Sequence, residues 1–218
     1  VDAFDSLPGR TDIAFDSAWK AFESAIKAAS TGNITDQLAK LASSELLHGD
    51  VVETLLSNIP AQSCEYLFKR LVLDFLSLPS IEERHRHRPS RRLRELRDPA
   101  ADSLFNDLHR RFGAAGDFGR NRDGAMLLRL ALGGQSVELD GVSVELSLPT
   151  RSAILLSGLL YTARNDRFHG ESFSPFVSSA ATLRTYTHPY FLFISAYSLL
   201  VALWVRPRPE GSRPRQKR

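Results

Sequence analysis

The sequence predicts an all-α fold that is interrupted by one β-hairpin. Apolar residues recur at intervals of three and four along most of the 218 residues, and helix-starting and helix-ending residues bound these segments. The period changes to alternation only near 136–148, around an Asp-Gly pair. A hydrophobic content of 43% is sufficient for one core. We therefore expect one helical domain over residues 1–205, followed by a basic tail at 206–218 with a composition typical of disorder.

Four helices are predicted in the first part of the chain. The stretch TDIAFDSAWKAFESAIKAAS places its aromatic and aliphatic residues on one helical face, and Thr11 or Asp12 is a suitable N-cap. The fourth helix begins near Pro60 and stops before Pro79, because proline is tolerated in the first turn and ends a helix elsewhere. The four segments are about 11–30, 34–48, 50–58 and 60–79.

The middle of the chain is predicted to contain an arginine-rich loop, one helix and a turn. The stretch IEERHRHRPSRRLRELR, residues 81–97, has no apolar face until its end, so we expect a loop that leads into a short helix. Asp98 is a suitable N-cap for the next helix, and Gly113 is a suitable end. Residues 116–124, GDFGRNRDG, lack the Lys and the Ser or Thr of a phosphate-binding loop and predict a turn.

The hairpin and a long apolar helix follow. Asp140 and Gly141 stand between two alternating apolar runs, which is the strongest short hairpin signal. After the hairpin, Thr150 or Ser152 can cap a helix that runs through ILLSGLLYTARNDRF and ends at Gly170. The part of this helix around ILLSGLL is expected to face the core.

The last helix has two interpretations. Residues 189–205 contain no charge and arginines follow them, which resembles a membrane anchor. The apolar stretch is shorter than the roughly 20 residues that cross a bilayer, and Ser195, Tyr197 and Ser198 interrupt it. We therefore favour a central bundle helix that starts at Pro189, and we expect no membrane partner. A membrane-tethered helical adaptor is the alternative.

The positive charge of the chain is local. The formal net charge is only +3, but 81–97 holds seven arginines against three glutamates, and 206–218 holds six basic residues against one glutamate. The remainder of the chain is acidic. Such segments favour a polyanionic partner, and a solvated linker with a disordered tail is the alternative.

Cysteine usage and the first residues favour a cytoplasmic protein without a metal site. Cys64 is the only cysteine, so neither an intrachain disulfide nor a Cys-based zinc site is possible. The opening VDAFDSLPGR contains acidic residues and no apolar run, unlike a signal peptide. His85 and His87 have no acidic or Cys partner at a useful spacing. We expect no metal and no cofactor.

A dense polar cluster ends the long apolar helix, and it is the strongest functional signal. Polar groups that arrive beside a buried face cost several kcal/mol if unpaired, so they must pair, face water or face another molecule. Surface pairing of Arg164 with Asp166 or Glu171, with His169 as a helix-end residue, is the structural alternative. The cluster consists of Arg164, Asn165, Asp166, Arg167 and His169.

This cluster resembles the motif of HEPN domains (higher eukaryotes and prokaryotes nucleotide-binding). Arg164 and Asn165, then three residues, then His169 match the family's Arg, polar residue, spacer and His. The resemblance implies an up-and-down helical bundle that dimerises through the motif face. It also implies a metal-independent ribonuclease that acts in toxin-antitoxin, antiviral defence or stress settings, with a possible antitoxin or defence-system partner protein. Other members only bind nucleotides or assist assembly, which is the second interpretation.

The spacing of the motif agrees with a composite site. Five residues at about 100° each leave Arg164 and His169 roughly 140° apart around a regular helix and about 7.5 Å apart along it. One straight helix therefore does not direct both side chains at one phosphate. We expect the last turn to unwind at Gly170 and a second subunit to complete the site.

The expected chemistry is attack of the RNA 2′-hydroxyl on the adjacent phosphorus. His169 can serve as general base or acid, and Arg164 can hold the non-bridging oxygens. The resemblance gives Asn165 an orienting role. The expected products are a 2′,3′-cyclic phosphate and a 5′-hydroxyl. Further RNA contacts are expected from Arg167, Tyr161, Arg91 and Arg92, although Arg167 could instead neutralise Asp166 and Tyr161 could pack in the core.

Overall fold

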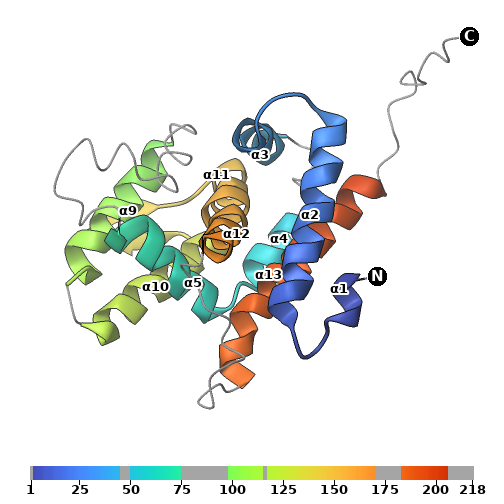
Figure 1. Cartoon of the computed structure of the whole chain (residues 1–218). Helices are drawn as coiled ribbons and strands as arrows, with labels where there is room; N and C mark the ends of the chain where they lie inside the picture. The colour runs from blue at the N-terminus through green and yellow to red at the C-terminus, as the bar shows by residue number, and fades with distance from the viewer. Residues whose placement is uncertain (1, 45–49, 75–97, 115–116, 170–182, 206–218) are drawn as a thin grey trace, which may run out of the picture.

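The fold of the chain is mostly helical with one small antiparallel sheet, as expected at that level of detail. The computed structural model describes residues 2–44, 50–74, 98–114, 117–169 and 183–205 (Figure 1). The helices are α1 (Asp2–Asp5), α2 (Thr11–Ala29), α3 (Ile34–Ser43), α4 (Asp50–Ser57), α5 (Ala61–Leu67), α9 (Pro99–Phe112), α10 (Phe118–Leu132), α11 (Leu148–Ala153), α12 (Tyr161–Phe168) and α13 (Leu183–Trp204), with π-helical segments η1 (Phe68–Leu73) and η2 (Ile154–Leu160). The strands are β1 (Val137–Leu139) and β2 (Val142–Val144).

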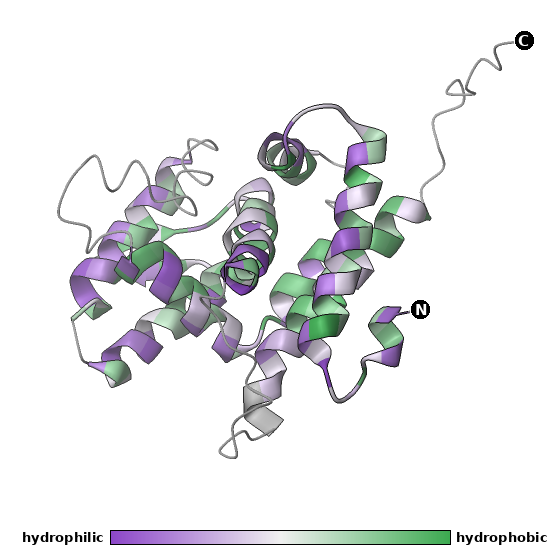
Figure 2. Cartoon of the chain, viewed as in Figure 1, coloured by the Kyte–Doolittle hydropathy of each residue, from purple (hydrophilic) through white to green (hydrophobic). Residues whose placement is uncertain are grey.

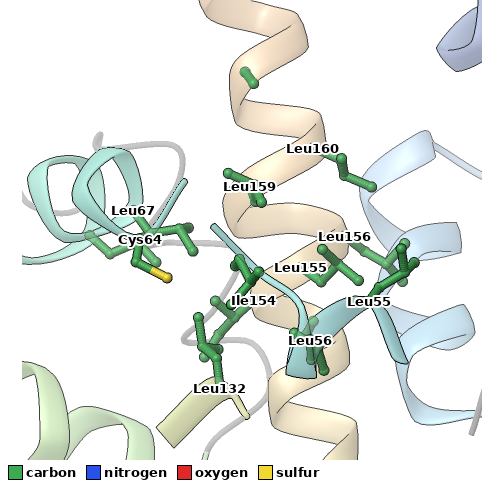
Figure 3. Close-up of a cluster of buried hydrophobic side chains, with 14 of the residues drawn as sticks. Leu55, Leu56, Cys64, Leu67, Leu132, Ile154, Leu155, Leu156, Leu159 and Leu160 are labelled. Atoms are coloured by element: carbon green, nitrogen blue, oxygen red, sulfur yellow. The ribbon is translucent and has the colours of Figure 1, made fainter. Parts of the chain in front are cut away.

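A single helical rod made of α11, η2 and α12 runs through the middle of the molecule. In Figure 1, α2, α3, α4 and α13 lie on one side of this rod, and α5, α9 and α10 lie on the other. All seven residues of η2 are buried, because ILLSGLL is apolar around its whole circumference. Figure 3 shows its leucines among side chains from the flanking helices, including Leu56 of α4, Leu67 of α5 and Leu132 of α10.

Close approach at Gly158 brings the two π-helical segments together. A Cβ atom at Gly158 would lie 3.4 Å from Leu71 Cδ1 of η1. The segment α5–η1 therefore lies against the rod at Gly158. The rod itself begins earlier than predicted: Ser147, and not Thr150 or Ser152, is the N-cap, and its hydroxyl accepts from the backbone N–H of Thr150. Pro149 then occupies the first turn, where its missing N–H costs nothing.

The pair α2 and α13 forms one side of the fold. α2 buries the predicted aromatic face, although Ile13 is exposed and the N-cap is Arg10 in place of Thr11 or Asp12. α13 lies beside α2 and also contacts α4, α5 and η2 (Figure 1). The predicted start at Pro189 is wrong, because the helix begins at Leu183 and Pro189 lies inside it. The stretch Tyr186–Trp204 is long and apolar enough to cross a membrane, and 44% of it is buried in the fold.

Residues 118–124 are helical, so the predicted turn at 116–124 is wrong. Asp117 caps α10, because its side chain accepts from the backbone N–H of Arg120 at 3.0 Å. Gly124 serves packing and not a turn: a Cβ atom there would lie 2.6 Å from Phe68 Cε2 and 2.8 Å from Phe112 Cβ. The glycine thus lets α10 lie close to η1 and α9.

The hairpin prediction is confirmed. Val137 pairs with Val144, and Leu139 pairs with Val142. The connecting Asp140 and Gly141 have φ values of 51° and 80°, as a two-residue turn with the twist of the strands requires. The hairpin packs its buried residues onto α10 and leaves the motif helix uncovered.

Candidate functional site

The polar cluster begins where the buried part of the rod ends. Figure 2 shows this change, since the end of the central helix is coloured hydrophilic. Asp166 is buried, Arg164 and Asn165 are half-buried, and His169 is exposed as the residue that caps the end of α12. The cluster therefore divides into groups with different surroundings.

Asp166 is bound within the fold by α5 and η1. Its Oδ2 accepts a hydrogen bond from the Tyr66 hydroxyl at 2.6 Å and from Arg70 Nε and Nη2 at 2.9 and 2.5 Å. Burial raises the pKa of Tyr66, and the Asp166 carboxylate raises it further. Burial alone would lower the pKa of Arg70, but its bond to Asp166 outweighs this and raises it. Asp166 is thus the partner of neither Arg164 nor Arg167, so pairing of either arginine with Asp166 is wrong. Glu171, the other partner considered for Arg164, lies outside the described residues.

Arg167 joins α12 to the beginning of α2. Its Nε and Nη2 donate to the two carboxylate oxygens of Asp16 at 3.1 and 2.8 Å, and Nη2 lies 3.4 Å from Asp12. Burial opposes the ionisation of Asp12, but hydrogen bonds from Arg10 and the charge of Arg167 outweigh it and lower the pKa of Asp12 to about 2. The Arg167 charge is balanced within the fold, so we assign this side chain a structural role.

Arg164 has no carboxylate partner within the described ranges. Its Nη1 donates to Asn165 Oδ1 at 3.0 Å, and its guanidinium carbon lies 4.9 Å from the centroid of the Phe168 ring. Asn165 therefore orients Arg164, and its backbone carbonyl also accepts from the His169 N–H at 2.9 Å. The guanidinium is fixed in position by neutral groups, and its charge acts on Glu23 of α2 only at a distance, as one of the causes that lower the pKa of that carboxyl.

Phe168 lies against both predicted catalytic side chains. The His169 ring meets Phe168 edge-on at a centroid distance of 5.8 Å, and Arg164 lies over the same ring. The helix stays regular to Phe168, and Gly170, where unwinding was expected, lies outside the described residues. The aromatic ring thus links side chains that the helical period separates.

Of the other predicted RNA contacts, the structure describes only Tyr161. Tyr161 stacks on Trp19 of α2, with ring centroids 5.9 Å apart and an interplanar angle of 28°. The alternative that Tyr161 packs in the core is confirmed. Arg91 and Arg92 lie outside the described residues, as do the rest of 81–97 and the tail 206–218.

A cavity of about 340 Å³ lies between α2 and α12, beside the motif. Its lining residues are Asp16, Lys20, Arg164, Arg167 and Phe168. The sequence prediction missed Lys20 and Phe168. Phe168 could have been noticed as an apolar residue placed after the end of the apolar run, but nothing in α2 alone connects Lys20 with the motif.

A half-buried histidine of α13 faces α5. Its Nδ1 is 2.9 Å from the Ser63 hydroxyl, and its ring lies 5.1 Å from that of Tyr66. This residue, His188, has a pKa lowered to about 4, because burial disfavours the charged ring. His188 therefore stays neutral at pH 7.

The free energy of unfolding is expected to decrease as the pH is lowered, because of His188. The unfolded state takes up a proton near pH 6.5, whereas the folded state does so only near pH 4, so stability is lost as the pH falls through this window. Between pH 7 and pH 5 the loss is about 2 kcal/mol. Urea unfolding at both values should show this loss in the native chain and a much smaller one in His188→Asn, which keeps a polar group beside Ser63. Equal losses in both proteins would contradict the assignment.

Other possible sites do not include the motif. A larger, mainly apolar cavity of about 780 Å³ lies between α13, the start of α2 and the end of α4, and no predicted site residue lines it. Within the part of the chain that the structure describes, no group of three or more His, Cys, Asp or Glu side chains could hold a metal ion. Comparisons of the chain with family models, with curated proteins and with solved structures gave no match.

Proposed function

We propose that this protein is a metal-independent endoribonuclease of the HEPN type. The observation that supports this most is the state of Arg164: Asn165 and Phe168 hold its guanidinium in place, yet among the described residues it forms no ion pair. Arg167, three residues later, has two carboxylate partners. A positioned cation that no carboxylate contacts in the described residues, beside an exposed histidine, suits a phosphodiester.

In the proposed reaction the RNA supplies its own nucleophile. His169 removes the proton of the 2′-hydroxyl, the 2′-oxygen bonds to phosphorus, and the bond from phosphorus to the 5′-oxygen breaks. Arg164 binds the non-bridging oxygens and stabilises their charge in the transition state. A protonated second histidine gives a proton to the leaving oxygen. The products are a 2′,3′-cyclic phosphate and a 5′-hydroxyl.

We propose that the second histidine is His169 of another copy of the chain. A single copy offers one exposed histidine at the end of α12, and the reaction needs one base and one acid. A homodimer that brings two α12 ends together supplies both. The resemblance to HEPN domains supports the same arrangement, together with a cytoplasmic role in toxin, defence or stress responses and a partner that restrains the enzyme.

A non-catalytic module that binds nucleotides or RNA, or that assists assembly, is the second candidate. The absence of an ion pair at Arg164 among the described residues favours it equally, because holding a phosphate needs no proton transfer. The two candidates differ in whether the RNA backbone is broken, so a cleavage assay separates them.

The proposed enzyme is expected to cleave RNA at an unchanged rate after metal removal, because an imidazole and a guanidinium carry out the reaction. A mixed-sequence RNA is incubated with the purified chain in excess EDTA. A 2′,3′-cyclic phosphate end is identified because phosphatases remove its phosphate only after acid has opened the ring. Cyclic phosphate ends at equal rates with and without EDTA support the enzyme. Intact RNA under both conditions, with binding retained, supports the module.

A further inference from the structure

We infer that Lys20 and Phe168 form, with Arg164, a subsite for one unpaired nucleotide of the substrate. Lys20 and Arg164 bind its phosphate, and the ring of Phe168 stacks on its base. This inference rests on the proposed function, because it takes RNA as the ligand. It adds a residue of α2, and the aromatic residue of the motif spacer, to a site predicted only from the polar residues of α12.

The charge balance around the cavity favours an anionic ligand. Within the described ranges, Lys20 is exposed and no carboxylate contacts it. Asp16, the carboxylate of the lining, is held by two hydrogen bonds from Arg167. Glu23, the next carboxylate along α2, accepts from Lys27 at 2.6 Å and from the Trp19 indole at 3.1 Å. The charge of Arg164 also contributes to lowering the pKa of Glu23. The lining nevertheless holds three cationic side chains, Lys20, Arg164 and Arg167, against the single carboxylate of Asp16.

The packing of α2 on α12 brings these two cations to the same cavity. Contacts between the helices run in opposite order, since Asp16 meets Arg167 and Trp19 meets Tyr161. Lys20 follows Asp16 by four residues and so lies on the same face of α2, one turn further along. It therefore reaches the side of α12 on which Arg164 lies, and both line the cavity. Its volume of about 340 Å³ is within the range of small-ligand sites.

Phe168 has the surroundings of a stacking surface. It is 75% exposed at the last position of α12, and the Arg164 guanidinium lies over its ring. Exposed aromatic rings beside cationic side chains bind unpaired bases in many proteins, with the base on the ring and the backbone on the cations. Tyr161 cannot serve in this way at the face that Trp19 covers.

The test measures binding without cleavage. The probe is a fluorescein-labelled octamer of 2′-O-methyl RNA, which lacks the nucleophile, and its anisotropy with the full chain is followed at several salt concentrations. Lys20→Ala is expected to weaken binding about five- to tenfold and to reduce the slope of log affinity against log salt by about 0.7. Phe168→Ala is expected to weaken binding by at least about fivefold with no change in slope.

Matched controls remove the same groups elsewhere. Lys40→Ala on α3 removes an exposed lysine, and Phe118→Ala at the start of α10 removes a ring that is 78% exposed. Both should change the affinity less than twofold. The subsite would be overturned if Lys20→Ala and Lys40→Ala bound the octamer with equal affinity. It would also be overturned if Phe168→Ala and Phe118→Ala bound it with equal affinity, or if the native chain did not bind it.

The same variants distinguish a failure of the subsite proposal from a failure of the ribonuclease proposal. If the native chain leaves unmodified RNA intact but binding depends on Lys20 and Phe168 as described, the subsite stands and the ribonuclease proposal falls. If the native chain cleaves RNA and Lys20→Ala binds and cleaves as well as Lys40→Ala, the subsite falls and the ribonuclease proposal stands.

Discussion

Replacing His169 by alanine is expected to lower the rate of RNA cleavage by at least about 100-fold, because the variant has no imidazole to accept the 2′-hydroxyl proton. Arg164→Ala should lower it by about 100- to 1,000-fold, since the charge that develops on the phosphate then has no guanidinium partner. Single-turnover cleavage of a 5′-labelled RNA, resolved on gels, measures both rates. Both variants should keep the native thermal transition, because His169 is exposed and Arg164 forms no ion pair among the described residues.

Two variants on other helices control for the loss of a histidine or an arginine. His109 lies near the end of α9, and Arg122 lies on α10, where it is exposed and paired with Glu65 at 3.6 Å. Alanine at either position should leave the cleavage rate within about twofold of the native value. Full activity in Arg164→Ala or His169→Ala would remove those residues from the reaction, and equal losses in the controls would indicate an effect on folding.

Asp166→Asn is expected to destabilise the fold by about 3 kcal/mol. Asp166 is 8% exposed and receives three hydrogen bonds, so its loss leaves the Arg70 charge without this carboxylate and weakens the bond from Tyr66. Breaking a largely buried ion pair by removing one partner typically costs this much. Urea unfolding monitored by circular dichroism gives the free energy of unfolding.

Asp16→Asn is the matched control for this prediction. It removes a carboxylate of α2 that binds Arg167 of α12, but Asp16 is 38% exposed and Arg167 keeps Asp12 within 3.4 Å. A loss of about 1 kcal/mol or less is expected, because exposed pairs contribute little. If the two variants were equally stable, the Tyr66–Arg70–Asp166 cluster would not fasten α12 to α5 and η1 as described.

Local patterns were sufficient to predict most of the described helices and the hairpin. The aromatic stripe of α2 is the kind of signal that depends only on residues within one turn, and Asp140-Gly141 determines its own backbone conformation. Asp98 behaves as predicted for the same reason, because its side chain caps the N–H of Ala100, two residues later.

The errors in the fold arose where distant residues decide the outcome. Residues 118–124 looked like a turn because of their glycines, whereas Gly124 is needed for contact with Phe68 and Phe112, which no local rule contains. Pro189 predicted a helix start because proline is favoured in the first turn. The helix α13, which packs against α2, instead begins one to two turns earlier.

The polar cluster of the site could be predicted, but its pairing could not. Density of charge at the end of an apolar helix was visible in the sequence, whereas the partners of Asp166 and Arg167 lie on α5, η1 and α2. Only this pairing distinguishes Arg167, which has two carboxylate partners, from Arg164, which forms no ion pair in the described residues. Lys20 could not be predicted for the same reason, because it is far from the motif in the sequence and lines the same cavity only when α2 packs against α12.

The wide turns of η2 have a consequence for the direction in which α12 presents its side chains. A π-helical turn accommodates an additional residue, and in a regular helix one residue corresponds to about 100° of rotation. The azimuth of every side chain after Leu160 is therefore determined by buried leucines that lie upstream of it. A rod of the same length without this widening would direct Arg164 away from Lys20 and rotate Asp166 off Arg70. The direction in which the side chains of the proposed site point is thus determined by η2, a buried segment that RNA does not contact.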